Sequence, residues 1–333
     1  MKLVIAIGGN ALLRRGQALT ASNQLASVRL AALQLARVAA QHAELVLTHG
    51  NGPQVGLLAL QASAYADSHS DLPAFPLDVL GAQTEGMIGY LLEQELSNAL
   101  PPGRQVSTLL TRVEVAADDP AFTHPSKPIG PVYSEDQLQT IAAAKDWKRV
   151  RDGGGWRRVV ASPQPLHVLG MPSIRWLLEH GVVVIACGGG GIPVARLPGR
   201  SEMRGVEAVI DKDLCSANLA IELDADCLII ATDVAGVCLD WGLATQHVLA
   251  QATPEQLAQH SFADGSMGPK VAAACAFVNA TGRRAVIGPL EQIEAMLAGR
   301  AGTQIKAALP WAAQTPAPAA SQPRPAAAPD SRP

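Results

Sequence analysis

Six short segments that are apolar at almost every position set the strongest limit on how this chain folds. They are KLVIAI, ELVLTH, QVSTLL, VVVIAC, CLIIAT and RAVIG, bordered by Gly, Asp or Asn. A strand buried on both faces has this continuous pattern. Between them, apolar residues recur every three or four positions at 22–43, 79–99, 213–223 and 267–280, and Ser22 or Asn23 is a candidate cap for the first stretch. The alternation predicts βαβ units in an open, mainly parallel sheet with helices on both faces.

Composition limits the partners of such a sheet. Aromatic residues make up only 4% of the 333 residues, so Ala, Val, Leu and Ile must build the core. A net charge of -3 favours small-molecule partners or copies of the chain over nucleic acid. The five cysteines have no C-x-x-C or zinc-type spacing, and no apolar run is long enough to span a bilayer. We expect a soluble, cytoplasmic protein without nucleic-acid or membrane partners.

Two regions depart from the alternation of strands and helices. Residues 118–168 are rich in Pro, Gly and charge, yet they retain the apolar anchors Tyr133, Trp147 and Trp156. This pattern predicts a small inserted subdomain with one short helix and a hairpin around GGGW. From residue 306 the chain is an Ala/Pro/Ser tail, for which we expect disorder and no catalytic role.

Five glycine-bearing turns stand at or near the ends of predicted strands, and they could converge on one site. They are GGN at 8–10, HGNGPQVG at 49–56, CGGGGIPV at 187–194, TDVAGV at 232–237 and DGSMGPKV at 264–271. The carboxyl ends of parallel strands border the ligand crevice of open α/β sheets, and glycine lets backbone N–H groups reach an anion. Lys212 and Lys270 stand at two helix entrances, and Lys127 lies in the inserted segment. Taken singly, each turn is more often plain turn geometry. Lys212 or Lys270 alone is as often a solvated lysine at a helix end as a phosphate ligand, and a lysine between prolines, such as Lys127, is often only a solvated loop residue.

Other phosphate-binding and hydrolytic motifs are missing from the sequence. It has no G-x-x-x-x-G-K-[ST], no G-x-S-x-G, no H-E-x-x-H and no well-placed G-x-G-x-x-G. Glycine turns, lysines and Mg²⁺ nevertheless suffice for phosphoryl transfer, which needs alignment and positive charge more than covalent chemistry.

Several segments, taken in order, resemble the carbamate kinases, a branch of the amino acid kinase family. They are AIGGNAL, THGNGPQVG, GMIGY, KPIGPVYSE, RRVVASPQP, ACGGGGIPV, AVIDKDL, TDVAGV and GSMGPKV, and they cover residues 1 to about 305. The resemblance implies an αβα sandwich with an open, mainly parallel sheet of about eight strands. It further implies a domain over 1–305 with 118–168 as a lid-like insertion, a homodimer, and interconversion of ATP plus carbamate with ADP plus carbamoyl phosphate.

The resemblance also implies roles for individual residues. Lys212 would bridge the acceptor and the γ-phosphate, Asp211 would orient Lys212 and its neighbours, and Lys127 would reach in from the insertion. The transferring phosphoryl group would be held by Gly8, Gly9 and Asn10, and the carbamate by Gly50, Asn51 and Gly52. The nucleotide would be bound by Lys270, Gly268, Met267 and the turn from Thr232 and Asp233 to Val237. Mg²⁺ would ride on the ATP phosphates without a dedicated protein metal site.

Two positions depart from the family pattern, and two alternatives stay open. Cys238 stands where an aromatic residue is common, and Glu85 stands where a small or uncharged polar residue is expected. The alternatives are a family member with a different carboxylate or phosphate acceptor, and a non-catalytic nucleotide-binding regulator. The resemblance favours operation towards ATP in arginine- or allantoin-type nitrogen catabolism, although neither direction nor pathway follows from the sequence.

Overall fold

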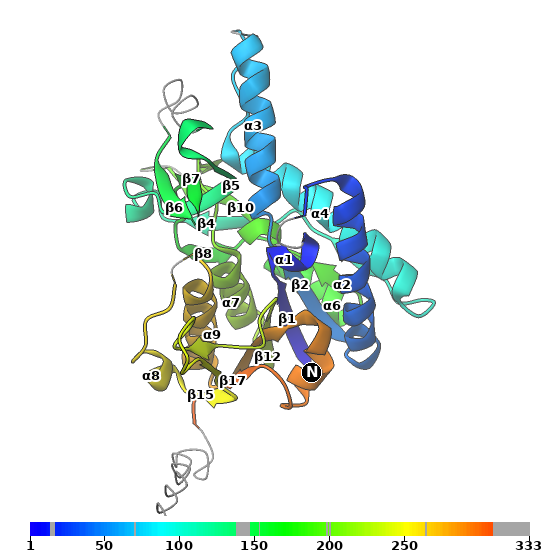
Figure 1. The fold of residues 1–333 in the computed structure, drawn as a ribbon. Helices are drawn as coiled ribbons and strands as arrows, with labels where there is room; N and C mark the ends of the chain where they lie inside the picture. The colour runs from blue at the N-terminus through cyan, green and yellow to red at the C-terminus, as the bar shows by residue number, and fades with distance from the viewer. Residues whose placement is uncertain are drawn as a thin grey trace, which may run out of the picture.

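The computed structural model describes residues 1–308 apart from residues 14–16, 70, 138–146, 153, 198, 200 and 264. Within these residues an eight-stranded sheet forms the centre of the molecule (Figure 1). Its order is β15 (Gln251–Ala252), β17 (Thr303–Ile305), β16 (Arg284–Pro289), β12 (Cys227–Thr232), β1 (Lys2–Ile7), β2 (Glu44–His49), β9 (Val183–Ile185) and β3 (Val106–Thr108). All six predicted strands lie in this sheet, so the prediction of one large, mainly parallel sheet is confirmed.

The central strands end together at one edge of the sheet. β1 lies between β2 and β12, and both pairings are parallel. Ile7, the last residue of β1, stands opposite His49 in β2 and Ala231 in β12. β16 and β17 form an antiparallel pair near the far edge. The turns that follow β1, β2 and β12 therefore leave the sheet side by side.

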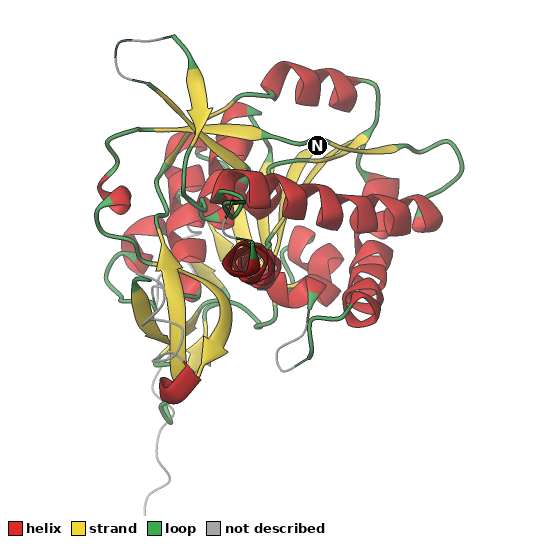
Figure 2. Cartoon of the chain, turned by 90° about the horizontal axis from the view of Figure 1, so that it is seen from above, coloured by secondary structure: helices red, strands yellow, loops and turns green. Residues whose placement is uncertain are grey.

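Helices cover both faces of the main sheet (Figures 1 and 2). Val4 and Ala6 of β1 belong to the hydrophobic core under α6, α7 and α9, whereas Leu3, Ile5 and Ile7 belong to the core under α2, α4 and α10. The helices are α1 (Gly9–Leu12), α2 (Ala21–Gln41), α3 (Gly52–Ser68), α4 (Leu77–Ala99), α6 (Met171–Glu179), α7 (Lys212–Glu222), α8 (Pro254–Leu257), α9 (Met267–Thr281) and α10 (Ile293–Leu297), with the short 3-10 helices η1 (Pro120–Phe122), η2 (Gly188–Gly190) and η3 (Leu290–Gln292). This is the predicted three-layer αβα arrangement.

The four predicted helices correspond to α2, α4, α7 and α9 with boundary shifts of one or two residues. The predicted cap of α2 is wrong, because the helix begins earlier. Thr20 has extended backbone angles, and its side chain accepts the N–H of Asn23 at 3.2 Å. Ser22 and Asn23 lie in the first turn of the helix instead.

Helix α3 is not among the predicted helices, because its glycines and proline resemble a turn. Pro53 lies in the first helical turn, where proline loses no hydrogen bond. Gly56 is needed for packing, since a Cβ there would lie 1.9 Å from the Cα of Gly130. The HGNGPQVG segment is therefore a short turn that runs directly into a helix, and that helix contacts the inserted region.

The inserted region contains a sheet of its own, built from β5 (Lys127–Tyr133), β7 (Gly155–Val160) and β6 (Arg149–Asp152). Asp152 pairs with Gly155, which confirms the hairpin around GGGW. The predicted short helix falls mostly on residues 138–146, outside the described residues. The predicted disorder of the tail likewise falls almost entirely on residues 309–333, which are not described.

Two further small sheets complete the described part of the chain. One has the order β11 (Met203–Gly205), β10 (Ile192–Arg196), β4 (Arg112–Val115), β8 (Pro165–Val168), and the other pairs β13 (Cys238–Leu239) with β14 (His247–Val248). Among the helices that are described, none has the length and apolarity to cross a bilayer.

Candidate active site

The turns after β1 and β2 lie in contact with each other. The Gly50 N–H donates to the Ile7 carbonyl at 3.1 Å, and a Cβ at Gly50 would lie 3.3 Å from the Gly9 nitrogen. The same Cβ would lie 3.3 Å from the Cδ atom of Lys212. A glycine at position 50 therefore lets both turns and the Lys212 side chain meet, as the sequence predicts for a shared site.

The backbone donors of these turns are not all available to a ligand. The Gly8 N–H donates to the Ala231 carbonyl at 2.9 Å and thus extends the sheet. Helix α1 begins at Gly9 and helix α3 begins at Gly52, and the first N–H groups of a helix have no partner within it. Apart from the neighbouring residues of its own helix, no described residue lies within 4 Å of a Cβ placed on Gly9 or Gly52. Gly8 shapes the turn, whereas Gly9 and Gly52 have open space beside them.

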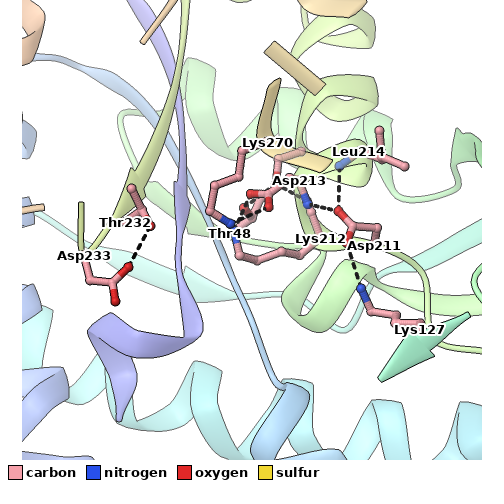
Figure 3. A network of polar contacts seen from close by, with 10 residues as sticks. Thr48, Lys127, Asp211, Lys212, Asp213, Leu214, Thr232, Asp233 and Lys270 are labelled. Atoms are coloured by element: carbon pink, nitrogen blue, oxygen red, sulfur yellow. Dashed lines mark hydrogen bonds and ion pairs between the residues drawn. The ribbon is translucent and has the colours of Figure 1, made fainter. Parts of the chain in front are cut away.

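One buried carboxylate holds two lysines from different helices (Figure 3). Asp213 accepts a hydrogen bond from Lys212 through Oδ1, and from Lys270 through Oδ2 at 2.9 Å. The side chains of Lys212 and Lys270 are only 11% and 16% exposed, so both ammonium groups are largely shielded from water. The arrangement fixes two cations at the end of the sheet, beside the glycine turns.

The charges of this cluster depend on one another. Burial raises the pKa of Asp213, but the two ammonium groups outweigh burial and bring the pKa to about 2. Burial lowers the pKa of Lys212 below its usual range, even though Asp213 favours its charged form. Asp213 is thus ionised at neutral pH, and its negative charge offsets the repulsion between the two lysines.

A second carboxylate, Asp211, binds the third predicted lysine. Lys127 of β5 donates to Asp211 Oδ2 at 2.8 Å, which brings the inserted region to the site. Asp211 Oδ1 accepts the N–H groups of Asp213 and Leu214 and so caps helix α7. Burial raises the pKa of Asp211, but the charge and hydrogen bond of Lys127 prevail and lower it.

The structure shows which carboxylate holds Lys212. Asp211, which we expected to orient Lys212 and its neighbours, caps the start of α7 and accepts a hydrogen bond from Lys127. Asp213 holds Lys212 instead, and sequence analysis did not select it. Acidic residues are common in the first turn of helices because they offset the helix dipole, so an aspartate at position 213 does not by itself indicate a functional site. The sequence pointed to it only through the two acids that flank Lys212 in the DKD segment.

Two hydroxyl groups anchor the helix that carries Lys212. Ser216 donates to the Lys212 carbonyl at 2.6 Å, and the hydroxyls of Ser216 and Thr48 lie 2.6 Å apart. Thr48 and Ser216 are fully buried. Because Ser216 uses its proton on the carbonyl, Thr48 must donate to Ser216. Strand β2 and helix α7 are thereby fixed to each other immediately behind the lysine.

The residues predicted to bind nucleotide occupy two neighbouring regions. Met267 and Gly268 open helix α9, and Lys270 is the fourth residue of this helix. Thr232 ends β12, and its hydroxyl donates to the carboxylate of Asp233 at 3.2 Å. Val237 is different, because its side chain is fully buried and its N–H donates to the Thr303 hydroxyl at 2.8 Å. Val237 supports the turn from within the core.

The glycine turn at 187–194 does not join the open site, which differs from the expected convergence of five turns. Gly188, Gly189 and Gly190 are buried in η2. A Cβ on Gly189 would lie 2.2 Å from the Nδ2 atom of Asn51, and one on Gly190 would lie 2.5 Å from the Ile210 carbonyl oxygen. This turn therefore lies behind residues 50–52, which are predicted to hold the acceptor and are called the acceptor turn below, and it packs against Ile210, which precedes Asp211.

Gln54 is a further polar residue that sequence analysis missed. It lies in the first turn of α3, is 3% exposed, and has no hydrogen-bond partner for either side-chain atom among the described residues. Buried amides are nearly always paired. A polar group bound next to the acceptor turn could form hydrogen bonds with this amide. A glutamine by itself carries no sequence signal for a binding site.

The carboxylates of the site have little capacity left for a metal ion. Both oxygens of Asp211 and both oxygens of Asp213 accept hydrogen bonds from lysines or backbone N–H groups. Across the described ranges, no three His, Cys, Asp or Glu side chains gather in a way that could hold a metal ion.

Comparison with known proteins identifies the family. The sequence profile of the amino acid kinase family matches residues 1–289. Carbamate kinase of Haemophilus influenzae is 52% identical over 305 residues, which cover 92% of this chain and 96% of the relative, and that of Pyrococcus horikoshii is 45% identical, covering 91% and 98%. The structure of Giardia lamblia carbamate kinase bound to AMP-PNP has a TM-score of 0.80 at 37% identity and covers 92% of this chain and 98% of its own. The chain therefore belongs to the amino acid kinase family and, within it, to the carbamate kinases.

Proposed function

We propose that this phosphotransferase catalyses reversible transfer of a phosphoryl group between ATP and carbamate, which yields ADP and carbamoyl phosphate. One observation carries the proposal. Lys127, Lys212 and Lys270 come from three separate elements and meet around Asp211 and Asp213, next to the Gly9 and Gly50 turns. Three cations beside open backbone donors suit a reaction that brings two anions together.

The proposed chemistry requires no general base. A carbamate oxygen is already anionic, so it attacks the γ-phosphorus directly while the bond from phosphorus to the bridging oxygen of ADP breaks. Lys212 lies against Gly50, which contacts the Gly9 turn, and would bridge the acceptor and the moving phosphoryl group. His49 takes no part as a base, because burial lowers its pKa to about 4 and it is enclosed in the core.

Lys270 and the start of α9 are proposed to hold the β- and γ-phosphates, with Thr232 and Asp233 flanking the nucleotide. Support comes from the position of Lys270, which shares Asp213 with Lys212. We propose that Mg²⁺ enters on the nucleotide, where it lowers the negative charge of the phosphates. The engaged oxygens of Asp211 and Asp213 support this route over a protein metal cage.

The inserted sheet is proposed to act as a lid over the acceptor. Its residue Lys127 reaches Asp211 at 2.8 Å, and its Gly130 backbone packs directly on Gly56 of α3. Movement of this sheet would therefore carry Lys127 towards or away from the site and would alter the contact between Gly130 and helix α3.

We propose that the protein is a homodimer. Strand β3 is the last strand of the sheet, and beside it Met87, Tyr90 and Leu110 are 38%, 63% and 61% exposed. Contiguous exposed apolar side chains are typical of protein interfaces. Sedimentation analysis is expected to give twice the mass of the chain, and Tyr90→Glu is expected to shift the equilibrium to monomer. A wild-type monomer at micromolar concentration would contradict the proposal.

The proposed direction is synthesis of ATP, in arginine- or allantoin-type nitrogen catabolism. Carbamoyl phosphate is a mixed anhydride with a higher phosphoryl-transfer potential than ATP, which favours this direction. We also propose a cytoplasmic location, since all five cysteines are free thiols, as in a reducing compartment. Metabolite measurements after deletion of the gene would test the pathway.

A steady-state assay tests the reaction itself. Purified protein with Mg²⁺, ADP and carbamoyl phosphate is expected to form ATP, measured by a coupled luminescence reaction. In the opposite direction, ATP should be consumed with carbamate and not with glutamate, aspartate or a nucleoside monophosphate. Turnover only with one of those acceptors would favour a different family activity. Nucleotide binding without turnover of any acceptor would favour a non-catalytic regulator.

A further inference from the structure

Glu85 is a buried carboxylate to which the proposed reaction assigns no task. It lies in α4, is 1% exposed, and forms no ion pair with any residue that the structure describes. Its two oxygens accept backbone hydrogen bonds, Oε1 from Gly188 at 2.8 Å and Oε2 from Thr111 at 3.1 Å. A buried carboxyl group without a cation is costly unless it is hydrogen-bonded, and these two hydrogen bonds tie Glu85 to two other segments of the chain.

The two N–H groups belong to two segments that lie next to each other. Gly188 opens the buried turn η2, and Thr111 precedes β4. The two segments are also tied to each other, since the Cys187 N–H donates to the Thr111 hydroxyl at 3.1 Å. Glu85 therefore clamps η2 to the strand next to it.

The turn that Glu85 clamps supports both halves of the reaction site. On one side Gly189 packs against the amide of Asn51, and on the other Gly190 packs against the Ile210 carbonyl, immediately before Asp211 and Lys212. These contacts are so close that the turn cannot shift without displacing its neighbours.

Helix α4 reaches the acceptor turn by a second route. Thr84, which precedes Glu85, accepts a hydrogen bond from Asn51 Nδ2 at 2.8 Å and donates to the Gly81 carbonyl at 2.8 Å. Thr84 thus holds Asn51 directly, and Glu85 holds it through the Gly188–Gly190 turn that packs against it. We infer that Glu85 is a positioning residue for the acceptor, which fixes Asn51 and the start of α7 by anchoring the Gly188–Gly190 turn. This inference rests on the proposed function.

Protonation of Glu85 couples this anchor to pH. Burial raises its pKa to about 8, so the neutral acid prevails at neutral pH. The titratable groups that face it are the His49 ring from β2 and the Cys187 thiol at the start of η2. Burial lowers the His49 pKa to about 4, and a hydrogen bond to Cys215 together with burial raises the pKa of Cys187, so both are neutral. Glu85 is the group of this set that changes charge between pH 7 and 9.

Kinetics of Glu85→Leu and Glu85→Gln test the inference. Leucine leaves two buried N–H groups without acceptors, so the KM for carbamoyl phosphate is expected to rise at least about ten-fold. The KM for ADP should stay within about two-fold, because Lys270 and α9 are untouched. Glutamine retains one acceptor oxygen and should give a smaller rise, of about five-fold, with weaker pH dependence of this KM between pH 7 and 9. If the leucine variant fails to fold, the glutamine variant decides.

Glu95→Gln is the matched control. Glu95 lies on the same helix and is also buried, but it pairs with Arg29 at 2.9 Å, away from the acceptor turn. Its variant should leave both KM values unchanged. Equal changes in the two KM values for Glu85 variants, or none, would overturn the inference while the proposed function stands. A wild-type protein that forms no ATP from carbamoyl phosphate would overturn the proposed function and this inference with it.

Discussion

Lys212→Met is expected to lower kcat for phosphoryl transfer by at least about 10³-fold, with ADP affinity within a few-fold of wild type. The Lys212 side chain lies against Gly50, which also contacts the Gly9 turn, so we expect its charge to act on the moving phosphoryl group more than on the nucleotide. Methionine keeps the length of the apolar stem, and Asp213 keeps Lys270 as its partner, so no buried carboxylate is left unpaired. Steady-state kinetics and calorimetric titration with ADP measure the two effects.

Lys270→Met is the matched comparison for this prediction. It removes the second lysine that pairs with Asp213, so one positive charge is lost at a site that is about as buried as that of Lys212. Its ADP affinity is expected to fall by roughly ten-fold, in addition to a loss of turnover. Wild-type turnover in Lys212→Met, or equal loss of ADP binding in both variants, would contradict the separate roles assigned to the two lysines.

Asp213→Asn is expected to cost both activity and stability. The substitution preserves shape but leaves two largely buried ammonium groups without their shared counter-charge. Removal of one member of a buried ion pair destabilises a protein by about 3–5 kcal/mol, and we expect a loss of this order in the free energy of unfolding. Because phosphates can replace the missing negative charge, ADP should raise the thermal midpoint of this variant more than that of wild type.

The pH dependence of the Asp213→Asn effect has a definite sign. The native pKa of Asp213 is about 2, below its usual value of 3.8, so ionised Asp213 stabilises the fold above about pH 4. This contribution is lost as the pH falls towards 2, and the difference between variant and wild type should shrink over that window.

Asp224→Asn provides the control for charge removal. Asp224 pairs with Arg283 at 3.1 Å but is 74% exposed, and its φ of 56° is one that asparagine tolerates. Exposed ion pairs contribute little, so its midpoint should barely change. If Asp224→Asn destabilised the protein as much as Asp213→Asn, the loss could not be attributed to burial of the Asp213 cluster. Chemical denaturation monitored by circular dichroism compares the variants.

Much of the scaffold was predictable because its signals are local. Strands buried on both faces are continuously apolar over five or six residues, and the covering helices have an apolar period of about 3.6, so both are visible in short windows of sequence. Helix α3 was not predicted because Pro53 and Gly56 resemble a turn. Gly56 is in fact required by a close backbone contact with Gly130, which lies far along the chain.

By itself, the sequence determined the alternating strands and helices, the glycine turns at the strand ends and the lysines that follow them. Only the tertiary structure decided which charges meet. Lys270 pairs with Asp213 across 57 residues and Lys127 with Asp211 across 84, while the neighbouring Asp211 turns away from Lys212 to cap its helix. It also placed the third glycine turn, at 187–194, behind the acceptor site, under Glu85. Pairings of this kind depend on long-range packing, which leaves no periodic trace in the sequence.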